Sequence, residues 1–175
     1  MLTKIDICSM ALMKIGEKPI QSFNEDSAAA QLARTLFDPV ADALLSCHPW
    51  RFATAAFDLA KTEGGDFLLP TEVLRVISCS AGRYEINGNR IKADAPAISL
   101  SAIIRTGPEI YPTFFVSTLA AKLATEFCVP LTGNQNAFAT FSAVFNSELR
   151  AARFIDSTMA SASDIQEFSL IRTRY

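Results

Sequence analysis

The sequence predicts a mainly α-helical α+β fold, in which a helical bundle core carries an inserted antiparallel β-hairpin and meander subdomain and an extended C-terminal arm ends the chain. Two observations lead to this prediction. Apolar residues recur at helical spacing over about 3–47 and 112–155, whereas about 52–105 shows the short apolar runs and turn signals of strands. With 175 residues the chain can bury one real core. We therefore expect one domain over 1–155, followed by a flexible linker and an arm over 156–175.

The N-terminal helix is indicated by its capping residues. Thr3 and Asp6 form a T-x-x-D capping pattern, and apolar residues follow at roughly helical spacing. Gly16 supplies a stop, because glycine readily adopts the left-handed conformation found after helix ends. We expect this helix over about 3–15.

A second helix is expected over about 27–47, after a cap at Asn24 or Ser27. Pro39 lies inside this range. Proline removes a backbone donor and clashes with the carbonyl four residues earlier, which costs about 3 kcal/mol in an unbroken helix. We therefore expect two segments, with Pro39 in the first turn of the second.

The junction after this helix, His48-Pro49-Trp50, is interpreted as a structural anchor together with Pro39. Trp50 is expected to hold the corner in the core, and the imidazole of His48 is placed to cap the last carbonyls of the helix. His48 is the only histidine, so it is also the only candidate for a histidine base. We favour the structural role over the catalytic one.

The β subdomain has its clearest signal at Asn87-Gly88, a dipeptide favoured in two-residue type I′ hairpin turns. Val73 to Cys79 is β-branched and apolar and predicts a strand. A turn at this dipeptide places an apolar face on one side of the hairpin and an ion pair on the other. The predicted pairs are Ile86 with Asn89, Glu85 with Arg90, and Tyr84 with Ile91.

Two further helices are expected over about 112–128 and 134–155, with Pro130 closing the first. The loop between them is short, which favours an antiparallel hairpin. Each helix presents an apolar stripe. The stripes are Phe115, Leu119, Leu123 and Phe127 on the first, and Phe138, Phe141, Phe145, Leu149 and Ala152 on the second.

Beyond Ile155 the chain is rich in serine and lacks amphipathic spacing until apolar residues return in 165–175. A solvated tail has no need of such residues, so we expect an arm that docks on another chain. The alternative is a tail that lies on its own domain. The candidate docking residues are Phe168, Leu170, Ile171, Arg172, Arg174 and Tyr175.

Composition favours assembly over nucleic-acid binding. Only 19% of the residues are charged, and half are apolar, so a monomer would leave much of its surface uncharged unless its core is unusually rich in phenylalanine. The net charge of −2 argues against a free nucleic-acid binder, although it is compatible with a channel through which DNA slides. A helical DNA-binding regulator remains an alternative, but 27–47 contains one arginine and no lysine, too few for a recognition helix.

No pattern in the sequence indicates catalysis, a metal or a cofactor. Cys8, Cys47, Cys79 and Cys128 lack C-x-x-C spacing and are interpreted as reduced core thiols. G-x-S-x-G, P-loop and dinucleotide patterns are absent from the sequence, and acidic residues near helix starts are explained by capping, so a cell-wall hydrolase is a weak alternative. No charged and apolar leader and no apolar run near 18 residues is evident, so we expect no membrane partner.

Five segments of the chain, taken in order, resemble one known family. The most informative is a helix that ends in His-Pro-Trp and runs directly into a strand. The segments are Ile7 to Ile20, Asp38 to Ala53, Leu68 to Val76, Tyr84 to Ile91 and Phe115 to Thr125. They resemble the tail tubular protein A type of head-to-tail adaptor found in short-tailed phages and prophages.

This resemblance implies a structural role in the virion. It implies a dodecameric ring at the head–tail junction, made in the bacterial host cytoplasm and assembled beneath the portal protein, with double-stranded DNA passing through without sequence-specific binding. The C-terminal arm would contact the portal, and the hairpin tip, with Glu85, Asn87, Gly88 and Arg90, is our candidate contact for the downstream tail tube or nozzle protein. A related adaptor of a long-tailed phage or gene transfer agent is the alternative.

Overall fold

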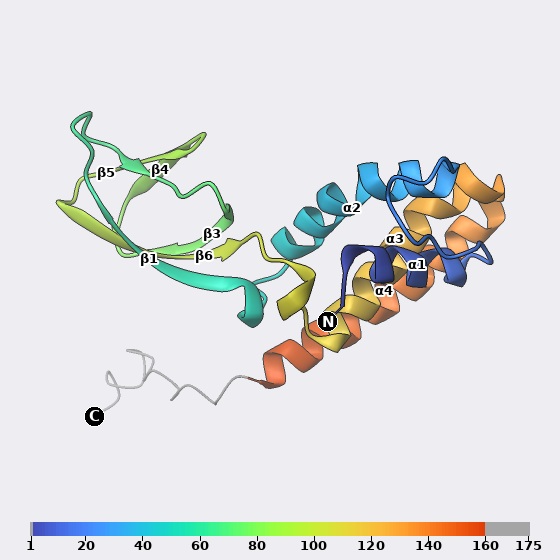
Figure 1. The fold of residues 1–175 in the computed structure, drawn as a ribbon. Helices are drawn as coiled ribbons and strands as arrows, with labels where there is room; N and C mark the ends of the chain where they lie inside the picture. Colours follow the sequence, from blue (N-terminus) through green and yellow to red (C-terminus); the bar gives the residue numbers. More distant parts are fainter. Residues whose placement is uncertain (1, 160–175) are drawn as a thin grey trace, which may run out of the picture.

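The computed structural model describes residues 2–159, which form four helices and two small antiparallel sheets (Figure 1). The mainly α-helical α+β prediction is confirmed. The helices are α1 Lys4–Lys14, α2 Ala28–Ser46, α3 Thr113–Thr132 and α4 Gln135–Thr158. The strands, all between α2 and α3, are β1 Thr54–Ala60, β2 Phe67–Leu68, β3 Val73–Cys79, β4 Tyr84–Asn87, β5 Arg90–Ala93 and β6 Ala97–Ile104.

Helix α3 is the centre of the helical part, because α1, α2 and α4 all pack against it. Its predicted stripe is confirmed: Phe115, Leu119, Leu123 and Phe127 are fully buried. The stripe on α4 packs against the same core, except that Phe138 is 45% exposed. The short loop between α3 and α4 makes them an antiparallel pair, as predicted (Figure 1).

The predicted caps of the first helix are present. The side chain of Thr3 accepts a hydrogen bond from the Asp6 amide at 3.2 Å, and the Asp6 carboxylate accepts one from the Thr3 amide at 2.8 Å. This reciprocal pair satisfies two amides that the helix leaves free. Gly16 follows with a φ of 84°, a left-handed conformation in which a side chain is strained.

Two prolines do not interrupt their helices where the sequence predicted. Helix α2, capped by Ser27, is continuous through Pro39, so the prediction of two segments is wrong. Phe37 and Val40 are buried on either side of Pro39, and burial of two such side chains offsets about 3 kcal/mol. Helix α3 likewise continues past Pro130 to Gly133, whose φ of 66° ends it.

The two sheets have the strand orders β1-β6-β3 and β2-β5-β4, and every pairing is antiparallel. They share a small core of their own. Strand β6 joins this core to the helical one, because Ile98 and Leu100 belong to the β cluster whereas Ile103 packs with the helices. The buried residues of the β cluster are Phe67, Leu69, Ile91, Ile98, Leu100 and Ala102.

The hairpin exists, but its predicted register is wrong. Asn87 pairs with Arg90 and Ile86 with Ile91, so the two turn residues are Gly88 and Asn89. Gly88 has a φ of 61° and Asn89 has a negative one, whereas a type I′ turn requires two positive values. The observed register places one isoleucine opposite another instead of opposite an asparagine. The shift is by two residues, so each side chain keeps its predicted face.

Helix α4 is longer than predicted. It ends at Thr158 rather than 155, so the first three residues assigned to the linker are helical. The reason lies at Asp156, which is 2% exposed and accepts a hydrogen bond from the backbone amide of Arg51 at 3.2 Å. A contact with a residue so distant in the sequence extends the helix without any local signal.

One helix within residues 2–159, α3, is long and apolar enough by length and composition to cross a membrane. The sequence analysis found no apolar run near 18 residues and therefore underestimated the apolar character of α3. Of its most apolar window, 61% is buried inside the fold, between the other three helices. The apolar character of α3 therefore serves the core.

Candidate assembly surfaces

The corner between α2 and β1 is built around Trp50, which is fully buried. Its indole Nε1 donates a hydrogen bond to the carbonyl of Leu44 at 2.9 Å, so the tryptophan satisfies one of the last carbonyls of α2. The ring lies edge-on to Phe115 with centroids 5.3 Å apart, an arrangement that adds to the energy of burial. Pro39 and Pro49, which were also predicted as anchors, lie at the surface.

His48 faces the end of α4 rather than the end of α2. Its Nε2 lies 3.4 Å from a carboxylate oxygen of Asp156, and its ring stands edge-on to Trp50 at 4.7 Å. The predicted capping of α2 by His48 is therefore replaced by Trp50. Burial lowers the pKa of His48 and Arg153 lowers it further, while Asp156 opposes the shift. The neutral imidazole is thus the form that the folded corner favours.

Arg153 of α4 completes this corner from the other side. Its Nη2 donates to the carbonyl of Cys47 at 3.4 Å and lies 3.5 Å from the sulfur. Cys47 is exposed, so the interpretation of all four cysteines as core thiols is wrong for this one and holds for Cys8 and Cys128, which are buried. Within residues 2–159, no three His, Cys, Asp or Glu side chains are grouped as a metal site would require.

The hairpin tip projects from the β part, and its candidate contact residues are exposed. Glu85, Asn87, Gly88 and Arg90 all lie at the surface. The structure does not bring Glu85 opposite Arg90: Lys92 is opposite Glu85, and Arg90 lies 3.7 Å from Asp66 instead. Glu85 and Arg90 nevertheless lie on the same face of the hairpin.

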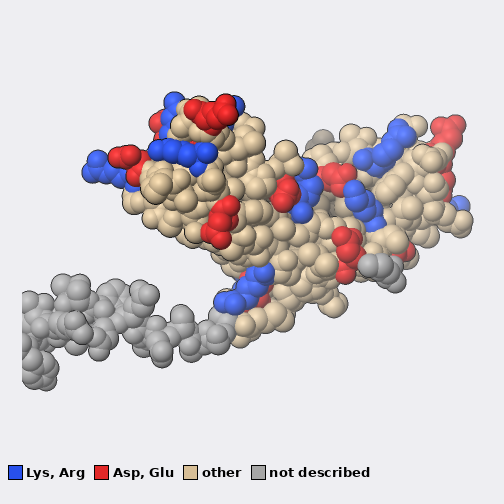
Figure 2. All heavy atoms as spheres, turned by 60° about the vertical axis from the view of Figure 1, so that its left-hand side comes forward, with Lys and Arg blue, Asp and Glu red and all other residues tan. Residues whose placement is uncertain are grey.

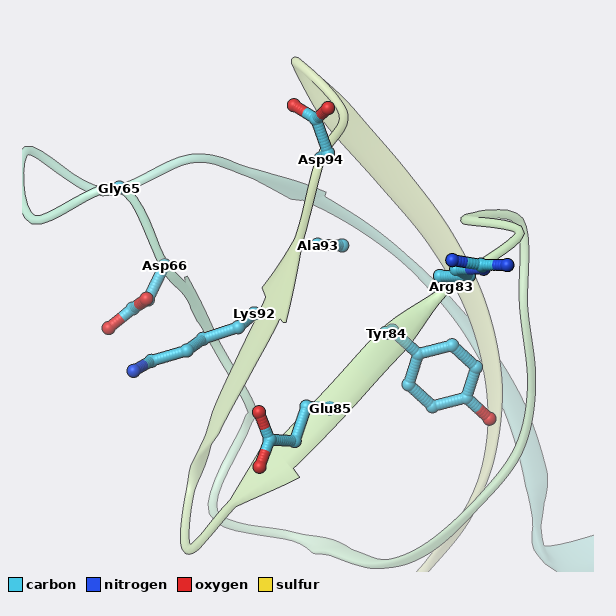
Figure 3. A pocket seen from close by; sticks show the side chains of 8 residues that line it. All are labelled: Gly65, Asp66, Arg83, Tyr84, Glu85, Lys92, Ala93 and Asp94. Atoms are coloured by element: carbon cyan, nitrogen blue, oxygen red, sulfur yellow. The ribbon is translucent and has the colours of Figure 1, made fainter.

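At the base of the hairpin is an open hollow of about 560 Å³, bordered by the ends of β4 and β5 away from the turn and by the β1–β2 loop (Figure 3). Figure 3 shows Asp66, Glu85 and Lys92 on one side of the hairpin and the ring of Tyr84 on the other. Figure 2 shows that basic and acidic side chains gather at this end of the molecule. The hollow is therefore a polar surface with charges of both signs.

Helix α4 has an outer face that the sequence analysis did not single out. Among its charged residues, only Arg150 is exposed, because Glu148 and Arg153 are half-buried and Asp156 is buried. Apolar side chains replace charges on this face. They are Val144, Phe154 and Ile155, with Phe154 69% exposed, while Phe138 and Met159 are exposed at the two ends of the helix. The sequence indicates this face by the scarcity of charged residues over the 24 residues of α4, but our sequence analysis considered only the core-facing apolar stripe.

The candidate arm residues Phe168, Leu170, Ile171, Arg172, Arg174 and Tyr175 lie outside the described residues. What the structure does describe is the place where this segment begins. Helix α4 ends at Thr158, beside the corner formed by His48 and Trp50, because Asp156 is tied there.

Comparison with known proteins identifies the family. No curated protein matches the chain. A family model described as Tail tubular protein matches residues 5–97, which span α1, α2 and all the strands up to the start of β6. The matched region includes the His-Pro-Trp corner and the hairpin, whereas the resemblance noted at Phe115 to Thr125 lies beyond it. Since the match covers more than half of the chain, this protein belongs to the tail tubular protein family, a family of structural phage proteins.

Proposed function

We propose that this protein is a head-to-tail adaptor that assembles as a ring beneath the portal, lengthens the DNA channel and receives the next tail component. The family match over residues 5–97 is the observation that carries the proposal. It places the chain among structural components of the phage tail. The adaptor role within that family follows from the resemblance of the ordered segments rather than from the match itself.

The surface of the helical part supports assembly. The outer face of α4 exposes large apolar side chains with Arg150 as its one exposed charge, and such faces occur where another chain is bound. Neighbouring copies held side by side on a portal could bury this face. Weak lateral contacts suffice when a preformed ring of sites keeps the copies close together.

The chain acts by binding rather than by catalysis in this proposal. His48, the only histidine, packs against Trp50 and Asp156 in the corner, where it contributes to structure. The pKa of His48 is lowered by burial, and no nucleophile contacts it among the hydrogen bonds of the described residues. We assign the same structural role to Trp50.

The C-terminal arm, 165–175, is proposed to contact the portal. Its apolar residues and two arginines support this role, because they provide anchors and charge contacts. Deletion of 165–175 is expected to abolish portal binding while circular dichroism shows an unchanged helical content. Portal binding that survives the deletion would remove the arm from the proposal and leave the ring intact.

The hairpin tip is proposed to contact the downstream tail component. Reversal of two charges, Glu85→Lys with Arg90→Glu, is expected to impair tail attachment and to spare ring formation. The matched control is Lys18→Glu, which changes an exposed charge in the connection between α1 and α2, outside the β part. Normal tail attachment by the double variant would assign the downstream contact to another surface.

Solution mass is the measurement that tests the adaptor role as a whole. Light scattering of the chain alone, and after mixing with the portal encoded beside it, should give a complex with a fixed, dodecameric stoichiometry. A chain that keeps its own mass and does not bind the portal would contradict the proposal. DNA binding would then be tested next, because a helical DNA-binding regulator is the alternative from another class.

A further inference from the structure

Helix α2 has two exposed stripes of different chemistry. Arg34, Asp38 and Asp42 follow one another at intervals of four and form a charged stripe, whereas the adjacent stripe, also at intervals of four, has no charge. The charged stripe has partners, since Lys4 contacts Asp38 at 2.6 Å and Arg105 Nε contacts Asp42 at 2.9 Å. The uncharged stripe consists of Gln31, Thr35, Pro39, Ala43 and Cys47, all of them exposed.

Two hollows lie along the uncharged stripe, between α2 and the helices beside it. One, of about 330 Å³, is bordered by the first half of α2 and by Pro130. The other, of about 270 Å³, is bordered by the second half of α2 and by Lys122, Phe145 and Leu149. Lys122 and Pro130 are eight residues apart on one face of α3, with Glu126 between them, so the hollows follow each other along a single groove. We call it the α2 groove.

We propose that the α2 groove binds the chain's own C-terminal segment, 165–171, in the unassembled protein. The proposal goes beyond the adaptor role and does not depend on it. The first support is reach. Helix α4 forms one wall of the groove at Leu149, and the described chain ends ten residues later at Met159, about 15 Å farther along the helix axis. Five extended residues span about 16 to 18 Å, so 160–164 can return the chain to the groove.

The second support is chemical complementarity. Phe168, Leu170 and Ile171 have the size and apolar character that the lining of Val40, Leu44, Phe145 and Leu149 would bury. Glu126, whose side chain is 37% exposed, lies between the two hollows and is paired with Lys122 at 2.6 Å, so a guanidinium of Arg172 or Arg174 would share this carboxylate with Lys122. The complementarity is therefore mainly apolar, because Lys122 also borders the groove and Arg153 contacts Cys47 at its end.

The linkage within one chain makes this occupant more favourable than a separate one. A short flexible connection gives an effective concentration of the order of millimolar, so a weak contact is sufficient to fill the groove. The serines and the aspartate of 160–164 favour turns, which the return path requires. A second copy could supply the same segment, but only at the concentration of the protein in solution.

Cys47 provides a direct test because it is exposed in the groove. In the full chain, Ser169→Cys should form a disulfide between the introduced thiol and Cys47 under mild oxidation, identified by mass spectrometry in protein of monomer mass. The same chain with Cys47→Ser is the control for bonds to other cysteines. Disulfides require Cα atoms within about 7 Å, so the bond reports close approach. Its absence would overturn the proposal, and bonds found only in dimers would assign the groove to a second copy.

A matched pair of variants in the Ser169→Cys chain tests the groove itself. Ala43→Glu places a charge in the uncharged stripe, whereas Ala143→Glu places the same charge at an exposed alanine of α4 outside the groove. The first should slow formation of the bond about tenfold, which corresponds to a loss of about 1.4 kcal/mol of docking energy. The second should leave the rate unchanged. Equal rates in the two variants would contradict docking in this groove.

A second measurement leaves the groove unaltered. The double substitution Phe168→Asp with Ile171→Asp should remove the apolar anchors and raise the rate at which Cys47 is alkylated in the full chain about tenfold. Cys79, in the β part, serves as the reference thiol within the same molecule. An unchanged ratio of the two rates would contradict the proposal, even if the disulfide had formed.

Discussion

The helical part and the β part differ in the size of their buried cores. The helical part buries large side chains of α1, α2 and α3 around Trp50 and Phe115, with partly buried side chains of α4 packed against them, whereas the β part buries six residues between two sheets of three strands. In β4 every residue is exposed. We therefore expect the helical part to resist deformation and the β part to present exposed backbone and charge. Strand β6 connects the two parts, because its Ile103 packs in the helical core, so a change in one part should reach the other there.

The largest expected effect is that of Trp50→Ala. The substitution removes the side chain at the centre of the aromatic cluster and leaves the Leu44 carbonyl without its indole partner, so it should destabilise the protein by about 3 to 5 kcal/mol. Urea unfolding followed by circular dichroism measures this loss. The comparison variant Trp50→Phe keeps an aromatic ring but loses the hydrogen bond and some buried volume, so it should cost less than Trp50→Ala. Similar midpoints for Trp50→Ala and the unaltered protein would contradict a helical core organised around this corner.

The next effect, Phe67→Ala, should be confined to one part. Phe67 is fully buried in the β cluster, and its removal should cost about 3 kcal/mol locally. Hydrogen exchange should speed up first in β2, β5 and β4, while the amides of α3 keep their protection. Equal acceleration in α3 would show that the two cores unfold as one unit and would remove the distinction drawn between them.

A smaller effect sharpens the description of the hairpin. Gly88→Ala places a side chain at a φ of 61° and should cost about 1 kcal/mol, with the loss seen as faster exchange in β4 and β5. Gly82→Ala is the matched control, because Gly82 has no positive φ and open space around it. If the two variants were equally stable, the turn would not require the left-handed residue that defines its register.

The smallest effect is a pH dependence in the corner. Burial lowers the pKa of His48 below its ordinary value of 6.5, so the unfolded chain binds the proton more tightly than the folded one. The contribution of the neutral imidazole to stability is therefore complete above about pH 6.5 and is lost as the pH falls through the lowered pKa. Urea midpoints of the protein and of His48→Gln, compared at pH 8 and at pH 5, isolate this group from the carboxylates that both share. The protein should lose stability relative to His48→Gln when the pH falls from 8 to 5. A gain in its stability relative to His48→Gln over the same range would show that protonation stabilises the corner, which is the opposite sign.

The sequence was sufficient where local patterns decide the structure. The capping box at Thr3 and Asp6, the buried stripe of α3 and the existence of the hairpin all follow from spacing within a few residues. It was insufficient where distant residues decide. Pro39 is tolerated because Phe37 and Val40 on either side of it are buried, and α4 extends because Asp156 meets Arg51, which precedes it by 105 residues.

The candidate site shows the same limit. The exposure of the hairpin tip could be expected from its polar residues, but the partner of Arg90 could not, because Asp66 comes from the β1–β2 loop. The uncharged stripe of α2 was visible in the sequence as an interval of four, yet it became a groove only when α3 and α4 were placed beside it.

The placement of α3 at the centre of the bundle has a consequence for synthesis on the ribosome. The chain emerges at about 5 to 20 residues per second, and α1 and α2 are made before any part of the helix that covers them. All six strands, by contrast, are complete once residue 104 has emerged. The β part can therefore fold while the growing chain still lacks its central helix, and α1 and α2 must wait for it with their apolar faces open to the chaperones of the host.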